Sequence, residues 1–94
     1  MILVSKDLRR KALRAFVMVT VKPGTSEDIV KSRRIKGVKI ANSVLGRFDA
    51  VVVVEAENLQ ELNRIIYQMV EQHPNVIHTE TLLSIFHPPL PNSL

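Results

Sequence analysis

The stretch SVLGRFDAVVVVEAE, residues 43–57, places two apolar runs on either side of a short polar turn. The turn is Gly46-Arg47-Phe48-Asp49, and a glycine there allows a sharp reversal of the chain. The runs 38–46 and 48–57 are joined so closely that they must pair as an antiparallel hairpin. An aromatic residue between an arginine and an aspartate is not needed to reverse a chain. The turn is therefore a candidate binding site as well as a hairpin.

Two elements are predicted before the hairpin. Residues 14–24 are rich in β-branched side chains and close with Pro-Gly, which predicts a strand. Residues 25–37 predict a helix, because Thr25 or Ser26 can cap its start and acidic residues occupy its first turn. Basic residues fall near the end of this segment, and Gly37 can terminate it. Its apolar face is thin.

Two further elements follow the hairpin. Asn58 can cap a second helix, and Pro74 ends it. Between them, apolar side chains recur at helical spacing: Leu59, Leu62, Ile65, Ile66, Met69 and Val70. Residues 76–86 predict the last strand, and a proline-rich tail follows over 87–94.

The order strand, helix, strand, strand, helix, strand predicts a ferredoxin-like (βαββαβ) plait of the α+β class. Right-handed crossovers then give an antiparallel four-stranded sheet with two helices on one face. The strands are apolar on both faces, most clearly over residues 51–54. Helices cover one face, so we expect the other to be buried by a second copy in a sheet-to-sheet dimer, a dimeric α+β barrel.

Composition limits the class of protein. The 94 residues allow one domain, and a hydrophobic content of 46% is ample for one core. The absence of cysteine excludes disulfides, thiolate nucleophiles and cysteine-bound zinc. No apolar run approaches the roughly 20 residues of a membrane helix. The first residues run from apolar to basic, the reverse of a secretory signal, so we expect a cytoplasmic protein with no membrane contact.

The net charge of +4 is concentrated at the N-terminus. Residues 1–14 carry five basic side chains and one acidic one, whereas residues 15–94 carry eight of each. We divide the chain into a basic arm (1–13), a folded domain (14–86) and the tail (87–94). The arm is either solvated, in contact with a partner, or an anion or nucleic-acid contact. We expect no direct DNA binding, because a broad basic face would be needed.

Catalytic motifs are not evident. The three histidines, His73, His78 and His87, lack other ligands at metal-binding spacing, and their positions favour structural roles. Neither a nucleophile elbow nor a phosphate-binding loop is found. We therefore expect no cofactor, no metal and no enzymatic activity.

The pattern VLGRFD before an apolar strand, with HTETLL in the last strand, resembles the effector-binding (RAM) domain of the Lrp/AsnC, or feast/famine, regulators. The resemblance runs from about Ala15 to Ile85, but residues 28–37 fit the family pattern poorly. Family members usually carry an N-terminal helix-turn-helix domain. Only 14 residues precede the match, too few for such a domain, so we expect a stand-alone RAM protein in which the basic arm is a remnant of the connector.

The resemblance implies a small-molecule site between subunits, lined by the hairpin turn and the last strand and commonly used by free amino acids. The residues implied are Gly46, Arg47, Phe48, Asp49, Thr79 and Thr81. An aspartate can accept from the ligand's ammonium, an arginine can pair with a carboxylate, and the threonine hydroxyls can serve either end. The backbone of a glycine can approach a ligand closely, and a phenylalanine can cover an apolar side chain.

Each of these residues also has a purely structural interpretation. Gly46 can supply a positive φ, Phe48 can fill a core or an interface, and Asp49 can cap the turn through backbone hydrogen bonds. Thr79 and Thr81 are ordinary strand residues.

The combined interpretation is an amino-acid-binding and oligomerisation module. It would form a homodimer that can assemble further into a tetramer or octamer, or join a full-length Lrp/AsnC regulator. Three alternatives stay open: a small dimeric α+β barrel enzyme, nucleic-acid binding through the basic arm, and a structural oligomer whose site is empty. The enzyme is disfavoured because the strands that would line its cleft are nearly all aliphatic.

Overall fold

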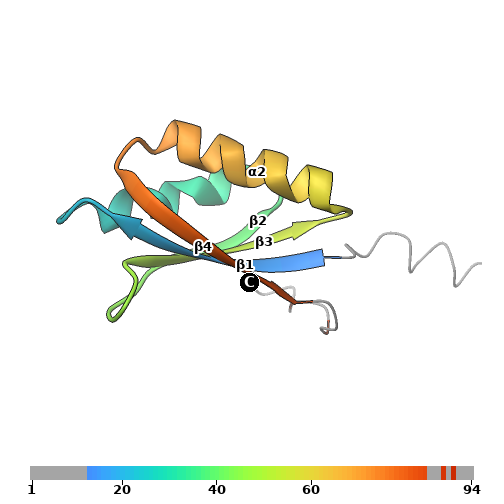
Figure 1. The fold of residues 1–94 in the computed structure, drawn as a ribbon, viewed down its shortest axis with the longest axis horizontal. Helices are drawn as coiled ribbons and strands as arrows, with labels where there is room; N and C mark the ends of the chain where they lie inside the picture. The colour runs from blue at the N-terminus through green and yellow to red at the C-terminus, as the bar shows by residue number, and fades with distance from the viewer. Residues whose placement is uncertain (1–12, 85–87, 89, 91–94) are drawn as a thin grey trace, which may run out of the picture.

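The computed structural model describes residues 13–84, Pro88 and Leu90, and in these residues the predicted order of elements is confirmed. The elements are β1 (Leu13–Val21), η1 (Ser26–Arg34), β2 (Val38–Ser43), β3 (Ala50–Ala56), α2 (Leu59–Gln72) and β4 (Val76–Ser84). Both helices lie on one side of a single sheet (Figure 1). The fold is the ferredoxin-like plait that the hairpin and the flanking helices predict. Most of the basic arm and of the proline-rich tail lie outside the described residues.

The sheet has the strand order β2-β3-β1-β4, and every neighbouring pair is antiparallel. The hairpin partners β2 and β3 are adjacent, as predicted. β1 lies between β3 and β4, so the first and last strands of the domain are hydrogen-bonded to each other. β2 and β4 form the two edges of the sheet among the described residues.

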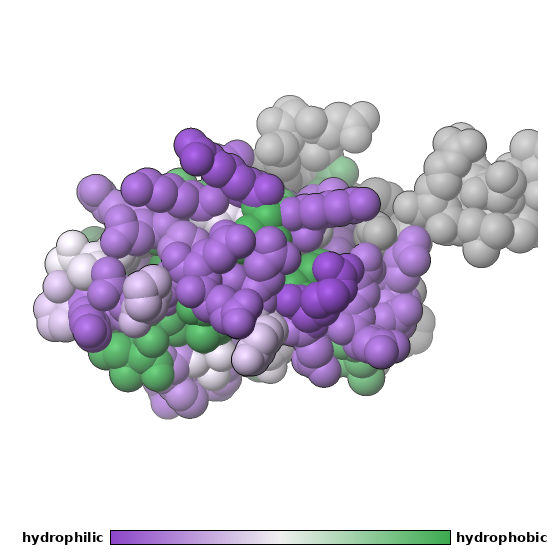
Figure 2. All heavy atoms as spheres, turned by 90° about the horizontal axis from the view of Figure 1, so that it is seen from above, coloured by the Kyte–Doolittle hydropathy of each residue, from purple (hydrophilic) through white to green (hydrophobic). Residues whose placement is uncertain are grey.

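The face of the sheet beneath the helices holds the core. Residues that are directly paired across antiparallel strands point to the same face, so the register assigns each side chain to a face. The row Ala41, Val52 and Val17 is fully buried beneath the helices. From α2, the core receives Leu62, Ile65 and Met69. The outer surface of the helical layer is mainly hydrophilic, as Figure 2 shows, so this surface can face solvent without a partner.

The opposite, open face carries an apolar row across all four strands: Ile40, Val53, Phe16 and Leu82. Phe16 and Ile40 are half-buried, and the side chain of Leu82 is 51% exposed. No helix among the described residues covers this face (Figure 1). A continuous apolar row on an uncovered sheet is typical of a surface that binds another protein surface.

An ion pair closes one end of the open face. Arg14 in β1 is paired directly opposite Glu55 in β3, and the guanidinium Nη2 lies 2.8 Å from Glu55 Oε2. The same Nη2 donates to the Pro88 carbonyl at 2.7 Å. The two charged side chains are only 7% and 14% exposed, and each charge has its partner. A second copy could therefore cover this end without leaving an unpaired charge, which would be costly.

The first helix differs from the prediction in form and length. η1 is a 3₁₀ helix over Ser26–Arg34, whereas the sequence predicted a helix over 25–37. Thr25 is its N-cap residue but makes no capping bond, and its hydroxyl donates instead to the Lys22 carbonyl at 2.7 Å. Its buried positions are Ile29 and Ser32, and Ile35 follows as the C-cap residue. They recur every three residues, and a helix with three residues per turn places them on one inward row.

The second helix begins where the sequence predicts. The Asn58 side chain accepts a hydrogen bond from Glu61 N at 2.8 Å, and the Glu61 carboxylate accepts from Glu57 N at 2.7 Å. This reciprocal arrangement is a variant of the capping box, in which the glutamate reaches one residue further back than usual. The helix ends at Gln72, before Pro74.

The hairpin connection is longer than the sequence predicts. β2 ends at Ser43 and β3 begins at Ala50, so the predicted strand residues 44–46 and 48–49 belong to a loop. We call residues 44–49 the hairpin loop. Val44 N donates to Asp49 O at 3.0 Å and closes its base. Leu45 is fully exposed, so its side chain gains no packing that would favour the strand conformation.

Substitution of Gly37 tests the packing between the η1–β2 connection and α2. Gly37 has a φ of +99°, and a Cβ there would clash with Ile65 Cδ1. We predict that Gly37→Ala lowers the free energy of unfolding through two effects. Backbone strain costs about 1–2 kcal/mol, and overpacking adds about 1–3 kcal/mol. Urea denaturation at fixed protein concentration measures the loss.

Gly24→Ala is the matched control, because Gly24 also has a positive φ of +81° but open space around its Cβ position. We expect it to show the strain alone. Equal losses in the two variants would contradict the close packing of Gly37 against Ile65.

Candidate functional site

Asp49 fixes the hairpin loop to the central strand β1. Its backbone N–H donates to Val19 O at 2.9 Å, and its carboxylate Oδ2 accepts from Val21 N at 2.9 Å. The ladder between β1 and β4 shifts register between Thr20 and Val21. The carboxylate thus accepts a hydrogen bond from a residue that lies where the ladder is irregular. The structural interpretation from the sequence was that Asp49 caps its own turn. Its carboxylate instead accepts a hydrogen bond from an N–H of another strand, β1.

The tip of the hairpin loop projects from the sheet on the side away from the helices (Figure 1). Gly46 has a φ of +136°, a value that favours glycine, and no atom lies within 4 Å of a Cβ position there. Arg47 is exposed and Phe48 is half-buried. The predicted positive φ of Gly46 is confirmed. Because Arg47 is exposed at the tip, its guanidinium is accessible to a group from outside this chain.

Thr79 and Thr81 lie on the other face of the sheet. Their partners across the ladder are Val19 and Val17, which are buried beneath the helices. The two threonines therefore share a face, as predicted, and that face is the helical one. Thr79 is half-buried and Thr81 is exposed, because β4 lies at the edge of the sheet. Thr81 is thus accessible from beside the sheet, and Thr79 is partly so.

A single chain does not bring the two halves of the predicted site together. Asp49 and Thr79 flank Val19 from opposite sides, so the full width of β1 lies between them. Two strand spacings amount to roughly 10 Å. The loop tip also points away from the face that carries the threonines. One small ligand cannot contact both halves within one chain.

The described residues hold no group of three or more metal-binding side chains, and their histidines do not cluster. His73 is the C-cap residue of α2, in agreement with the predicted helix-end position. His78 is exposed on β4 opposite Thr20, and His87 lies outside the described residues. Among the residues that the structure describes, only Arg14 and Ser32 are polar and buried. They come from different faces of the domain, so neither has a catalytic partner in the core.

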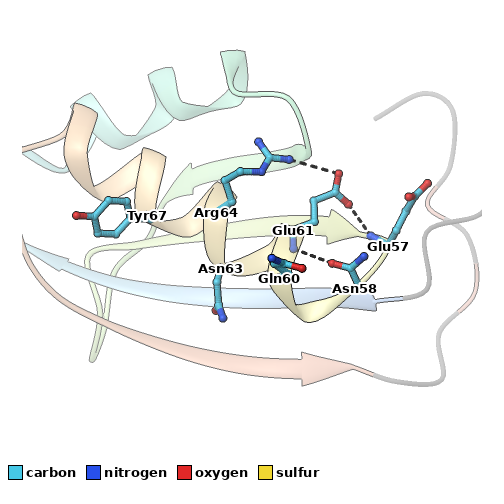
Figure 3. Close-up of a pocket in the computed structure, with 7 residues that line it drawn as sticks. All are labelled: Glu57, Asn58, Gln60, Glu61, Asn63, Arg64 and Tyr67. Atoms are coloured by element: carbon cyan, nitrogen blue, oxygen red, sulfur yellow. Dashed lines mark hydrogen bonds and ion pairs between the residues drawn. The ribbon is translucent and has the colours of Figure 1, made fainter.

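A shallow hollow of about 670 Å³ lies over the start of α2, away from the predicted site. Its lining residues all come from one segment, 57–67, and Figure 3 shows them along the outer side of the helix. Arg64 Nη2 lies 3.6 Å from Glu61 Oε2, and Glu61 also takes part in the cap with Asn58. These contacts stabilise the helix terminus, and the hollow is a helix surface rather than a cleft.

Charge is distributed unevenly within the folded domain, although it sums to zero there. Residues 29–48, which include most of η1 and all of β2, carry six basic side chains and no acidic one. The six are Lys31, Arg33, Arg34, Lys36, Lys39 and Arg47, and all are exposed. A charge summed over the whole domain does not reveal this basic segment.

Comparison with known proteins identifies the family. A model described as the Lrp/AsnC ligand binding domain matches residues 14–88, which is most of the chain. The chain belongs to this family, and the fold and family together define an effector-binding regulatory module. The matched family consists of ligand-binding domains of transcription regulators rather than enzymes. No curated protein sequence is matched.

Solved structures agree with this assignment. The chain is similar to the hypothetical protein PHS023 from Pyrococcus horikoshii (26% identity, TM-score 0.71), covering 80% of this chain and 92% of that one. It is also similar to TTHA0845 from Thermus thermophilus (25% identity, TM-score 0.73), with 83% and 99% covered. The transcriptional regulator NMB0573 from Neisseria meningitidis, solved with L-Met, shares the fold at 16% identity and a TM-score of 0.73. That match covers 94% of this chain and 59% of the regulator.

Within the described ranges, the helices are too short or too polar to span a membrane.

Substitution of Asp49 tests its role in fixing the loop. We predict that Asp49→Ala lowers the free energy of unfolding by about 1–3 kcal/mol, because the Val21 N–H loses its acceptor. Asp49→Asn is the matched variant, since its amide oxygen can still accept from Val21 N. It should cost less than the alanine. Urea denaturation measures both, and equal stability of Asp49→Ala and the original protein would contradict this role.

Proposed function

We propose that the domain binds a free amino acid between subunits and that occupancy shifts its assembly, with itself or with a regulator carrying the same domain. The observation that carries the proposal is the separation of the hairpin loop and the threonine pair onto opposite faces of one chain (Figure 1). A second copy can supply the missing half. The family match and the regulator NMB0573, solved with L-Met, support an amino acid as the ligand class.

The chemistry of the hairpin loop suits one end of such a ligand. Asp49 uses Oδ2 for Val21 N, and its second oxygen can accept from an ammonium. Arg47 is exposed at the tip and can pair with a carboxylate of the ligand or of a neighbouring subunit. Phe48 is half-buried and can cover an apolar side chain. Thr79 and Thr81 of a second subunit would supply hydroxyls on the other side.

The open face supports a sheet-to-sheet dimer as the unit of assembly. Its apolar row crosses all four strands, and the ion pair at one end is already satisfied. An amino acid bound between subunits favours the assembly that completes its site, by as much as its affinity for the two states differs.

Native mass spectrometry before and after adding the twenty common amino acids tests the proposed ligand. We expect a dimer or larger oligomer that gains one amino-acid mass per subunit. Asp49→Asn should lose this adduct while keeping the fold, because it removes the negative charge and retains the acceptor for Val21 N. A stable oligomer with no added mass, or an adduct unchanged in Asp49→Asn, would contradict the proposal.

A charge on the open face tests the dimer. We predict that Leu82→Lys shifts the protein from dimer to monomer in sedimentation at micromolar concentration, because it places an ammonium in the apolar row. Leu82 is half-exposed in a single chain, so the variant should fold. Tyr67→Lys, on the exposed side of α2, is the control and should remain dimeric. A dimeric Leu82→Lys would show that the open face is not the interface.

A further inference from the structure

One side of the domain carries positive charge with no local counter-charge. η1 packs against β2, which is an edge of the sheet in the described part of the chain, so the two elements share this side (Figure 1). Five exposed cations come from this side: Lys31, Arg33, Arg34, Lys36 and Lys39. We call these five residues the basic side.

The 3₁₀ form of η1 places its cations on outward rows. Residues three apart lie above one another in such a helix, so Lys31 and Arg34 form one row, and Arg33 and Lys36 continue another. The helix dipole favours cations at a helix C-terminus, which accounts for those in the last turn of η1. This effect does not extend beyond the last turn, so it does not account for Lys39 in β2.

The basic side is not neutralised by the rest of the domain. None of its five cations forms an ion pair with another described residue. The ion pairs in the described ranges join Arg14 to Glu55 and Arg64 to Glu61. Residues 49–94 carry six acidic side chains and a single basic one, so the acidic charge comes mainly from later elements. A cluster of unbalanced cations creates a positive potential that attracts an anionic partner.

A hollow of about 280 Å³ lies at the basic side, between the η1–β2 connection and α2. Lys36 and Lys39 both line it. Its two carboxylates are already engaged, because Glu55 Oε2 accepts from Arg14 Nε at 2.9 Å and Glu61 accepts from a backbone N–H in the cap of α2. The two lysine ammonium groups can therefore pair with an anion from outside the chain. A phosphodiester carries one negative charge, so one such group suffices for this hollow.

The surface around these cations is polar. β2 exposes Asn42 and Ser43, which can donate hydrogen bonds to phosphate oxygens. Interfaces between proteins depend on apolar and aromatic anchors, and no large hydrophobic side chain is exposed in η1 or β2. Single-stranded nucleic acid is held by stacking on aromatic side chains, and residues 26–43 include none. The surface therefore favours the phosphate backbone of a duplex over an acidic protein or a single strand.

We propose that the basic side binds the phosphate backbone of a DNA duplex without reading its sequence. Lys36 and Lys39 together hold one phosphate at the hollow, and Lys31, Arg33 and Arg34 contact neighbouring ones.

The length of this side suits such a partner. β2 has six residues, which extend over roughly 20 Å, and B-DNA carries about twelve phosphate charges over that length. The sequence predicted no direct DNA binding, because a domain with zero net charge shows no broad basic face. The packing of η1 against β2 provides one. It includes neither the open face nor the hairpin loop, so this proposal does not depend on the proposed function.

Fluorescence anisotropy with two DNA duplexes of unrelated sequence, each of about 20 base pairs, tests the proposal on the full chain. We expect both to bind equally, with a Kd of about 1–100 μM near physiological salt. A plot of the logarithm of the association constant against that of the salt concentration should have a slope of about −4, as four phosphate contacts predict. No binding at about 50 mM salt, or a strong preference for one duplex, would overturn the proposal.

Two matched pairs of arginines show where the DNA lies. Arg33→Gln with Arg34→Gln should weaken binding and reduce the steepness of the slope by about two, since each arginine contacts a phosphate. Arg9→Gln with Arg10→Gln removes the same charge from the basic arm and should change the slope less. An equal or larger change in the arm variant would overturn the proposal, because total charge or the arm would then govern binding.

The lysines of the hollow provide a second variant that leaves η1 intact. Lys36→Gln with Lys39→Gln should reduce the steepness of the slope by about one, because the two share one phosphate. Both side chains are exposed, so the core is unchanged. Binding that neither this variant nor the η1 arginine variant weakens would contradict the assignment. Stronger displacement by poly-L-glutamate than by unlabelled duplex at equal charge would indicate an acidic protein partner and would also overturn it.

Discussion

The hydrogen bond from Val21 N to the Asp49 carboxylate ties the hairpin loop to the central strand of the sheet. It joins residues 28 positions apart and lies where the ladder between β1 and β4 shifts register. On one side it fixes the base of the hairpin loop, so that the tip projects beyond the sheet. On the other side it fixes the end of β1, where the next residue, Lys22, donates its N–H to Asn75 O in the turn before β4.

The two faces of the sheet have different roles because both helices pack on the same face. The helical face is closed by side chains from η1 and α2 and supplies the stability of a single chain. The open face keeps an apolar row that one chain leaves partly exposed. Small domains have little core to spare, and such a row is best explained by association. Ligand binding between subunits would also be linked to assembly, because it favours the oligomer in which the loop and the threonine pair of different chains meet.

Much of the fold could be predicted from the sequence, because its signals are local. The cap at Asn58, the stop at Pro74 and the close spacing of the hairpin strands each depend on neighbouring residues. The 3₁₀ form of η1 could not be predicted, because its inward row includes Ser32, which a hydropathy pattern counts as polar. The hairpin loop also proved longer than expected, because strand pairing stops at Ser43 although apolar residues continue.

Less of the candidate site could be predicted from the sequence. The shared face of Thr79 and Thr81 follows from strand alternation, but which face they occupy depends on pairing with β1. The partner of Asp49 in β1 and the meeting of Asp28 with Asn75 are long-range contacts that no local pattern indicates. Residues 28–37 fit the family pattern poorly and supplied no candidate site residue, although the family match extends across them.

Subunit mixing tests most directly whether the hairpin loop and the threonine pair of different chains share one ligand. Asp49→Asn and Thr81→Val proteins are each expected to bind amino acid poorly at this site. After unfolding and refolding together, hybrid oligomers should regain binding, because a hybrid interface can combine an intact loop with an intact threonine pair. With one parent uniformly ¹⁵N-labelled, native mass spectrometry can separate the hybrid species by mass and count the ligand on them. Hybrids that bind no more than either parent would contradict a site built from two chains.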